Sequence, residues 1–240
     1  AEWTAQRKGI LDRVMFLGGN KPADAYDTVD LGLNFARGNL TLATGLSNAT
    51  NEKGVQSITG APAGVAAKYL SRSSIDTLGV IGTGRIARRA AEAVACVRKF
   101  RRIKVYSPNP EHRLSYAHDM GALLSVEVEP EEEPKKVVES ADILIAATNA
   151  HRPVYDGDWL QPGALVISLA PGEVDVRTLE RGRFFSTWKE QALHDRPPRE
   201  PFKTLEAQGR LAEFEEKCRE LHDVVTGVLP GRTNDEEIIT

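Results

Sequence analysis

Residues 77–87 constrain the fold of this chain more than any other segment of its sequence. They read Thr-Leu-Gly-Val-Ile-Gly-Thr-Gly-Arg-Ile-Ala. The apolar run predicts a short buried strand, and the helical spacing that follows predicts a helix. Between the two, Gly82, Gly84 and Ala87 form the pattern G-x-G-x-x-A. In this pattern the first glycine permits a tight turn, the second lets a pyrophosphate approach the backbone, and the alanine lets helix and strand pack closely.

A helix that starts directly after such a turn presents backbone N–H groups to a phosphate. We therefore expect a dinucleotide to bind at five consecutive residues, Gly82, Thr83, Gly84, Arg85 and Ile86. A glycine-rich turn can also serve only as a turn, and that alternative stays open. Because strand, turn and helix occur here in the required order, the sequence favours nucleotide binding.

Strand-like and helix-like segments alternate through the middle of the chain. Continuous or alternating apolar runs predict strands, and apolar stripes at helical spacing predict helices between them. This alternation predicts an α/β fold, a Rossmann-type, doubly wound parallel sheet. The expected strands are residues 75–81, 103–107, 123–128, 141–147, 164–168 and 184–188, and the expected helices are 86–97, 111–120 and a short one that ends at 140.

The two ends of the chain are patterned differently. In the first sixty residues, only 10–17, 29–33 and 40–43 resemble strands, and residues 61–70 form a helix rich in small residues that suits tight packing. From residue 205 onward, apolar positions recur at helical spacing up to Gly227. We expect one amphipathic helix there, which packs either on the sheet or against the first sixty residues.

The composition is that of an ordinary globular protein. Apolar residues make up 41%, charged residues 27%, and the net charge is −3. We expect neither a nucleic-acid partner nor a membrane span, and no signal peptide is visible. Cys96 and Cys218 lie far apart and lack metal-ligand spacing, so we expect no metal site and two reduced, buried thiols in a cytoplasmic protein. The acidic run 129–134 is expected to be a solvated turn, with an acidic partner-binding segment as the alternative.

The residues after the second central strand determine which cofactor is expected. An Asp or Glu at that place binds the 2′-hydroxyl of NAD, whereas basic or polar side chains accommodate the 2′-phosphate of NADP. Here no carboxylate directly follows the strand. The residues found there instead are Ser107, Asn109 and Arg113. The sequence therefore favours NADP, with NAD as the second possibility. The alternative is that Arg113 is only a surface residue of the next helix.

Polar residues also follow the strand that ends at residue 147. The carboxyl end of this strand is expected to open toward the nicotinamide, with Thr148 and Asn149 as polar contacts. His151 is a candidate proton donor, because histidine titrates near neutrality. No partner carboxylate is evident, so a loop histidine without a catalytic role is favoured.

Several further motifs resemble the ornithine cyclodeaminase/mu-crystallin family, and together they cover most of residues 59–240. The resemblance implies a Rossmann-type domain over residues 70–204. It implies a second, smaller α+β domain for dimerisation and substrate binding, built from residues 1–69 and 205–240, of which a part is expected to be either missing or rebuilt in this chain. The motifs that carry the resemblance are residues 59–61, 65–70, 79–84, 105–113, 141–149, 159–163 and 230–233.

The sequence also departs from the family pattern. Family enzymes carry an arginine that binds the substrate carboxylate where this chain has Ile58. They also carry a catalytic lysine, for which Lys21 and Lys53 are the only weak candidates near plausible turns. The cyclodeaminases have an aspartate in the loop that reads Ser-Leu-Ala-Pro-Gly at residues 168–172 here, so cyclodeamination itself is not favoured.

The resemblance implies hydride exchange between a nicotinamide and the α-carbon of an amino or imino acid. We therefore expect a homodimeric NAD(P)-dependent reductase or dehydrogenase that acts on a small imino, keto or amino acid. Two alternatives stay open. One is a protein that binds NADP and a small ligand without the family reaction, and the other is an enzyme for a substrate that lacks an α-carboxylate.

Overall fold

A computed structural model describes residues 2–5, 14–18, 29–37, 40–46, 52–170, 172–194 and 196–240, with side chains from residue 60 onward. The chain divides into two compact units, Ala1–Thr59 and Gly60–Thr240. The second unit contains the segment that constrains the fold, so the candidate site belongs to it.

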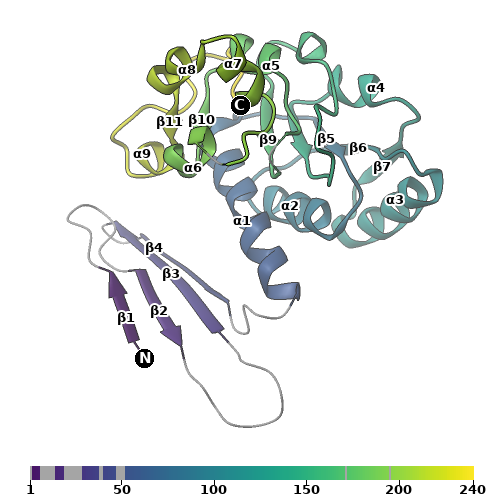
Figure 1. Ribbon diagram of the computed structural model, residues 1–240. Helices are drawn as coiled ribbons and strands as arrows, with labels where there is room; N and C mark the ends of the chain where they lie inside the picture. The colour runs from purple at the N-terminus through teal and green to yellow at the C-terminus, as the bar shows by residue number, and fades with distance from the viewer. Residues whose placement is uncertain are drawn as a thin grey trace. The chain divides into compact units, whose positions relative to one another are not determined.

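The first unit contains a four-stranded antiparallel sheet with strand order β1-β2-β3-β4 (Figure 1). Its longest pairing joins β3 to β4, from Leu31 opposite Leu46 to Arg37 opposite Leu40. The three strands expected in this part of the sequence fall within or overlap β2, β3 and β4. The strands are β1 (Glu2–Ala5), β2 (Val14–Gly18), β3 (Val29–Arg37) and β4 (Leu40–Leu46).

The second unit is built on a five-stranded parallel sheet with strand order β7-β6-β5-β8-β9. The order reverses between β5 and β8, which form the two sides of the crevice where ligands bind in open α/β sheets. This arrangement confirms the expected Rossmann-type fold. The strands are β5 (Thr77–Ile81), β6 (Arg102–Tyr106), β7 (Glu127–Pro130), β8 (Ile143–Ala146) and β9 (Leu165–Ser168).

Helices cover both faces of this sheet, as the ribbon in Figure 1 shows. Each parallel crossover carries its helix, so β5, β6 and β7 are joined through α2 and α3, and β7 is joined to β8 through α4. The helices are α1 (Glu52–Leu70), α2 (Arg85–Ala95), α3 (Pro110–Leu124), α4 (Pro134–Val138), the 3-10 helix η1 (Gly157–Trp159) and α5 (Val176–Arg181).

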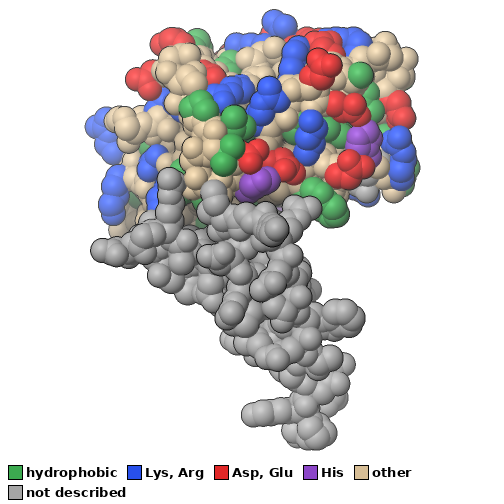
Figure 2. Space-filling model, turned by 90° about the vertical axis from the view of Figure 1, so that its left-hand side faces the viewer, with side chains coloured by type: hydrophobic (Ala, Val, Ile, Leu, Met, Phe, Trp, Pro, Cys, Tyr) green, Lys and Arg blue, Asp and Glu red, His purple; other side chains and the backbone are tan. Residues whose placement is uncertain are grey.

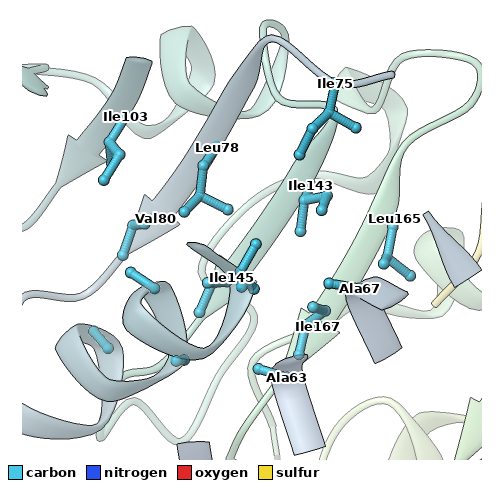
Figure 3. Packing of buried hydrophobic residues seen from close by; sticks show 14 of the residues in the cluster. Ala63, Ala67, Ile75, Leu78, Val80, Ile103, Ile143, Ile145, Leu165 and Ile167 are labelled. Carbon is cyan, nitrogen blue, oxygen red and sulfur yellow. The ribbon is translucent and has the colours of Figure 1, made fainter. Parts of the chain in front are cut away.

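The two faces of the sheet form two separate hydrophobic cores, because successive strand residues point to opposite sides. On one face, Leu78, Ile145 and Ile167 pack with the small residues Ala63 and Ala67 of α1 (Figure 3). On the opposite face, the neighbouring strand residues Ile81, Leu144 and Val166 pack with α4 and the segment that follows β8. Burial on both faces explains why these strands are continuous apolar runs.

The segment from residue 202 onward contains short elements, and the expectation of one amphipathic helix there was wrong. Gly209 has a φ of +69° after α7, and Cys218 is extended after α8, where the chain pairs with β10 instead of continuing as a helix. The apolar positions Leu205, Phe214 and Cys218 are nevertheless buried together. Two elements precede this segment, β10 (Phe185–Ser186) and α6 (Lys189–His194). The elements within it are α7 (Phe202–Ala207), α8 (Leu211–Lys217), β11 (Arg219–Glu220) and α9 (Leu221–Val225).

The last residues extend the parallel sheet beyond β9. The Ile239 N–H donates to Ala164 O at 3.0 Å, and the Val166 N–H donates to Ile239 O at 2.7 Å. On the other side, the Phe185 N–H donates to Thr240 O at 2.7 Å. This segment thus lies between β9 and β10 within the second unit. The domain assignment made from the sequence, with residues 205–240 joined to 1–69, stays a prediction.

Three smaller expectations also need correction. Helix α3 continues to Leu124, so the strand expected over 123–128 begins only at Glu127. The strand expected over 184–188 is only two residues long. Cys218 is buried as expected but Cys96 is exposed, because it lies at the end of α2, outside the stripe that faces the sheet.

Acidic and basic side chains are interspersed over the face of the second unit that Figure 2 shows. In the part of the chain that the structure describes, no helix is long and apolar enough to cross a membrane. Within the same described residues, no group of three or more His, Cys, Asp and Glu side chains is placed to hold a metal ion.

Candidate functional site

The glycine-rich turn lies at the carboxyl end of β5, enclosed by the two neighbouring strands. Gly82 has a φ of +103°, and its N–H donates to Tyr106 O at 2.9 Å. A Cβ atom at Gly82 would lie 2.2 Å from Ala147 O. Only glycine avoids both the backbone strain and this collision, so the turn can pass between the ends of β6 and β8.

Gly84 differs from Gly82 in what surrounds it. Its backbone is extended, with φ −71° and ψ 179°, and a Cβ atom built on it meets nothing within 4 Å. Gly84 is the N-cap of α2, which has no side-chain cap and no acidic residue in its first turn. The helix N-terminus therefore faces open space, as an approaching pyrophosphate requires. Ala87, the third small residue of the pattern, is fully buried. These residues fit a dinucleotide.

The residues after β6 are brought together by Arg113. Its Nη1 donates to Ser107 O at 2.7 Å, and its guanidinium carbon lies 6.0 Å from the centroid of the Tyr106 ring. Arg113 is thus held at the strand end, in the place where a 2′-phosphate is expected. The Asn109 side chain accepts a hydrogen bond from the Glu111 N–H at 2.9 Å and so caps α3. The nucleotide contacts expected of Ser107, Asn109 and Arg113 stay predictions.

The polar residues after β8 divide into one that is engaged by the protein and two that are exposed. The Thr148 hydroxyl donates to Glu173 Oε1 at 2.9 Å and accepts from the Ala150 N–H at 3.2 Å. Asn149 and His151 are exposed. Among the described residues, no carboxylate forms a hydrogen bond or ion pair with His151. Its role as a proton donor stays a prediction, as do the contacts expected of Thr148 and Asn149.

Glu173 is the residue at this edge of the sheet whose importance the sequence did not reveal. It is fully buried and accepts hydrogen bonds from the segments after both β8 and β9. The only signal in the sequence was a carboxylate beside Gly172 and before Val174, which resembles an ordinary surface turn. Burial raises the pKa of the nearby Tyr155 phenol. A hydrogen bond from the Thr178 hydroxyl lowers this pKa, and the negative charges of Asp175 and Glu173 raise it further.

The lysine candidates lie outside what the structure describes at the level of side chains. Lys21 falls among the residues without a described position. Lys53 and Ile58 belong to the first part of α1, residues 52–59, of which only the backbone is described. The expectations about a catalytic lysine and about the substitution at Ile58 therefore rest on the sequence.

The strand order, the glycine-rich turn and the open helix N-terminus define a Rossmann-type α/β protein. The chain belongs to the ornithine cyclodeaminase/mu-crystallin family, whose profile matches residues 44–240. This finding confirms the resemblance carried by the sequence motifs.

Individual relatives agree with this family assignment. Over 190 residues the chain is 30% identical to the delta(1)-pyrroline-2-carboxylate reductase of Bacillus cereus, covering 75% of this chain and 56% of the relative. It is also 30% identical to the alanine dehydrogenase of Archaeoglobus fulgidus over 188 residues, covering 75% and 55%. The chain thus spans about half the length of these curated relatives.

The fold is also similar to that of a solved structure, the delta(1)-pyrroline-2-carboxylate reductase of Thermococcus litoralis in complex with NADH and L-proline. The TM-score is 0.70 with 28% sequence identity, and the match covers 90% of this chain and 66% of the Thermococcus protein. Because the match covers 90% of this chain, it includes most of the Rossmann-type unit that carries the glycine-rich turn.

Proposed function

We propose that this chain carries the cofactor site of an NAD(P)-dependent oxidoreductase for a small imino, keto or amino acid. The observation that carries the proposal is the open N-terminus of α2 at Gly84, beside the point where the strand order reverses. A bound nicotinamide would supply or accept the hydride. The residues of this chain would hold the pyrophosphate at Gly82–Gly84 and orient the nicotinamide beyond β8.

The relatives support an imino acid as the first substrate class to examine. The Thermococcus structure contains NADH and L-proline, and the Bacillus relative is a pyrroline-2-carboxylate reductase. Cyclodeamination is not favoured, because the loop after β9 lacks the aspartate that the family resemblance leads one to expect. Ile58 cannot form the bidentate contact of an arginine with a carboxylate, which keeps a substrate without that group as the alternative.

Among nicotinamide cofactors we favour NADP. The Arg113 guanidinium is fixed at the end of β6 by Ser107 O, and no Asp or Glu follows this strand directly. An arginine at this place would pair with a 2′-phosphate, whereas a carboxylate would repel it.

A homodimer and a cytoplasmic location complete the proposal. Both rest on the family resemblance and on the composition of the sequence. Sedimentation velocity at micromolar concentration should show a species of about twice the 26.3 kDa chain mass. A single species at the chain mass would contradict the dimer.

Titration with NADPH, followed by its fluorescence, tests the cofactor site. We expect Gly84→Ala to weaken NADPH binding by about tenfold or more, because the methyl group would occupy the space of the pyrophosphate. Gly121→Ala is the matched control, since its Cβ would make only an ordinary contact of 3.5 Å. Arg113→Gln should weaken NADPH about tenfold and leave NADH unchanged.

Unchanged NADPH affinity in Gly84→Ala would contradict the proposed site. Oxidation of NADPH with delta(1)-pyrroline-2-carboxylate, or with pyruvate and ammonia, then tests the reaction. Binding of NADPH without turnover of any imino or keto acid would favour a binding protein. Turnover only of imines without a carboxylate would favour an enzyme whose substrate lacks the α-carboxylate.

A further inference from the structure

We propose that Glu173 is a positioning residue that fixes the two loops at the nicotinamide side of the cofactor site. What these loops face rests on the proposed function, whereas their connection to Glu173 is a feature of the fold. The first loop is residues 148–154, after β8. The second is residues 168–170, which begins at Ser168, the last residue of β9. The first of them carries Asn149 and His151.

Each carboxylate oxygen of Glu173 serves one of the two strand ends. Oε1 accepts from the Thr148 N–H at 2.5 Å and from the Thr148 hydroxyl at 2.9 Å. Oε2 accepts from the Ser168 hydroxyl at 2.9 Å, the Leu169 N–H at 3.1 Å and the Ala170 N–H at 2.9 Å. One side chain thus joins the carboxyl ends of β8 and β9.

The backbone of Glu173 adds a third connection. Its carbonyl oxygen accepts from the Val154 N–H at 3.0 Å. The loop after β8 is therefore held at both of its ends, at Thr148 by the side chain and at Val154 by the backbone. Asn149 and His151 lie between these two anchors, so their place depends on Glu173.

The environment of Glu173 excludes a direct role in proton transfer. Its exposed fraction is 0%, and both oxygens are occupied by hydrogen bonds from uncharged donors. A general acid or base must reach the reacting atom directly or through one water. Glu173 therefore does not replace the loop aspartate of the cyclodeaminases, and its effect must pass through the loops that it holds.

A carboxylate suits this place better than an amide. All five hydrogen bonds end on its oxygens, and hydrogen bonds to a charged acceptor are stronger than those between neutral groups. A glutamine would present an NH₂ group to the donors of one strand end and leave them without an acceptor. The change Glu173→Gln therefore releases one loop while it preserves the size of the side chain.

The test compares NADPH with 2′-phospho-ADP-ribose, which lacks the nicotinamide. Both ligands would use the turn at Gly82–Gly84 and the end of β6, but only NADPH reaches the loops at Glu173. In Glu173→Gln we expect NADPH affinity to fall about tenfold, measured by calorimetry, with the affinity for the fragment changed less than about twofold. A general loss of folding would weaken both ligands equally.

Asp175→Asn is the matched control, because it makes the same chemical change two residues further on. Asp175 accepts from the Thr178 N–H, the Thr178 hydroxyl and the Gly157 N–H at 2.7–2.9 Å, so it serves α5 and η1. We expect Asp175→Asn to lower the melting temperature while the ratio of the two affinities stays that of the wild type.

Ser168→Ala keeps the proposal testable if Glu173→Gln does not fold. It removes one of the five donors and should weaken NADPH about twofold to threefold, with the fragment unchanged. An equal change for both ligands, or no change for NADPH, would overturn the positioning role. If the wild type binds neither ligand, the proposed function itself fails and the positioning role fails with it.

Discussion

At the scale of single residues, the two glycines of the turn have different physical roles. Gly82 is required by the fold, because it combines a φ of +103° with a neighbouring carbonyl where a Cβ would lie. Gly84 is not required by the fold, because its surroundings are open, and the proposed function assigns this open space to the ligand. The sequence pattern treats the two positions alike, and only the structure separates them.

This difference predicts opposite effects on stability. We expect Gly82→Ala to lower the free energy of unfolding by about 3 kcal/mol, through a strained backbone and the collision with Ala147 O. Gly84→Ala should change it by less than about 0.5 kcal/mol. Urea unfolding without cofactor measures both values, and a Gly82→Ala protein as stable as the wild type would contradict the described turn.

At the scale of elements, the small residues of α1 allow it to cross α2 closely. A Cβ at Gly64 would lie 2.9 Å from Ala93 O, and one at Gly60 would lie 2.9 Å from Arg89 Cβ. Ala63 and Ala67 meanwhile face the sheet next to Ile167 and Leu165 (Figure 3). The sequence predicted tight packing for this helix from its small residues, and the structure identifies α2 and the sheet as its neighbours.

Enlarging this crossing should destabilise the second unit. We expect Gly64→Val to lower the free energy of unfolding by about 2–3 kcal/mol, because the Ala93 backbone cannot retreat from the added methyl groups. Ala61→Val is the control, since Ala61 is exposed on the same helix and the change costs only helix propensity. Equal losses in the two variants, measured by denaturant unfolding, would show that the crossing is not close.

The elements also show where prediction from sequence succeeds. Strands β5, β8 and β9 are buried on both faces, so their apolar runs alone identified them. For the segment after residue 205 the prediction of one helix was wrong, because the helical spacing of its apolar residues continues through Gly209 and Cys218. The break at Cys218 depends on pairing between β10 and β11, which no local pattern encodes.

At the scale of the whole molecule, buried tyrosines make stability depend on alkaline pH. Burial raises the pKa of both Tyr116 and Tyr155 well above 10.0. Above about pH 10 the unfolded chain releases these protons while the folded chain retains them. The free energy of unfolding therefore falls as the pH rises, by up to about 1.4 kcal/mol per pH unit for each tyrosine.

The variant Tyr116→Phe removes the contribution of Tyr116 to this pH dependence of the free energy of unfolding. Tyr116 Oη is buried and has no hydrogen-bond partner among the described residues, so its removal should change stability by less than about 1 kcal/mol at pH 7. Between pH 10 and 12 we expect the variant to lose less stability than the wild type. Urea unfolding at several pH values measures the difference, and parallel curves would contradict a protonated native Tyr116.

The sequence by itself determined the alternation of strands and helices in the middle of the chain, the Rossmann-type class and the glycine-rich turn, because each depends on patterns among residues that are neighbours in the chain. Only the tertiary structure decided the places of Glu173, of Arg113 against Ser107, and of Ile239 between β9 and β10. Each of these contacts includes backbone N–H or carbonyl groups among its hydrogen-bond partners. Since backbone groups occur along the whole chain, no pattern of side chains in the sequence indicates which backbone groups will form these hydrogen bonds.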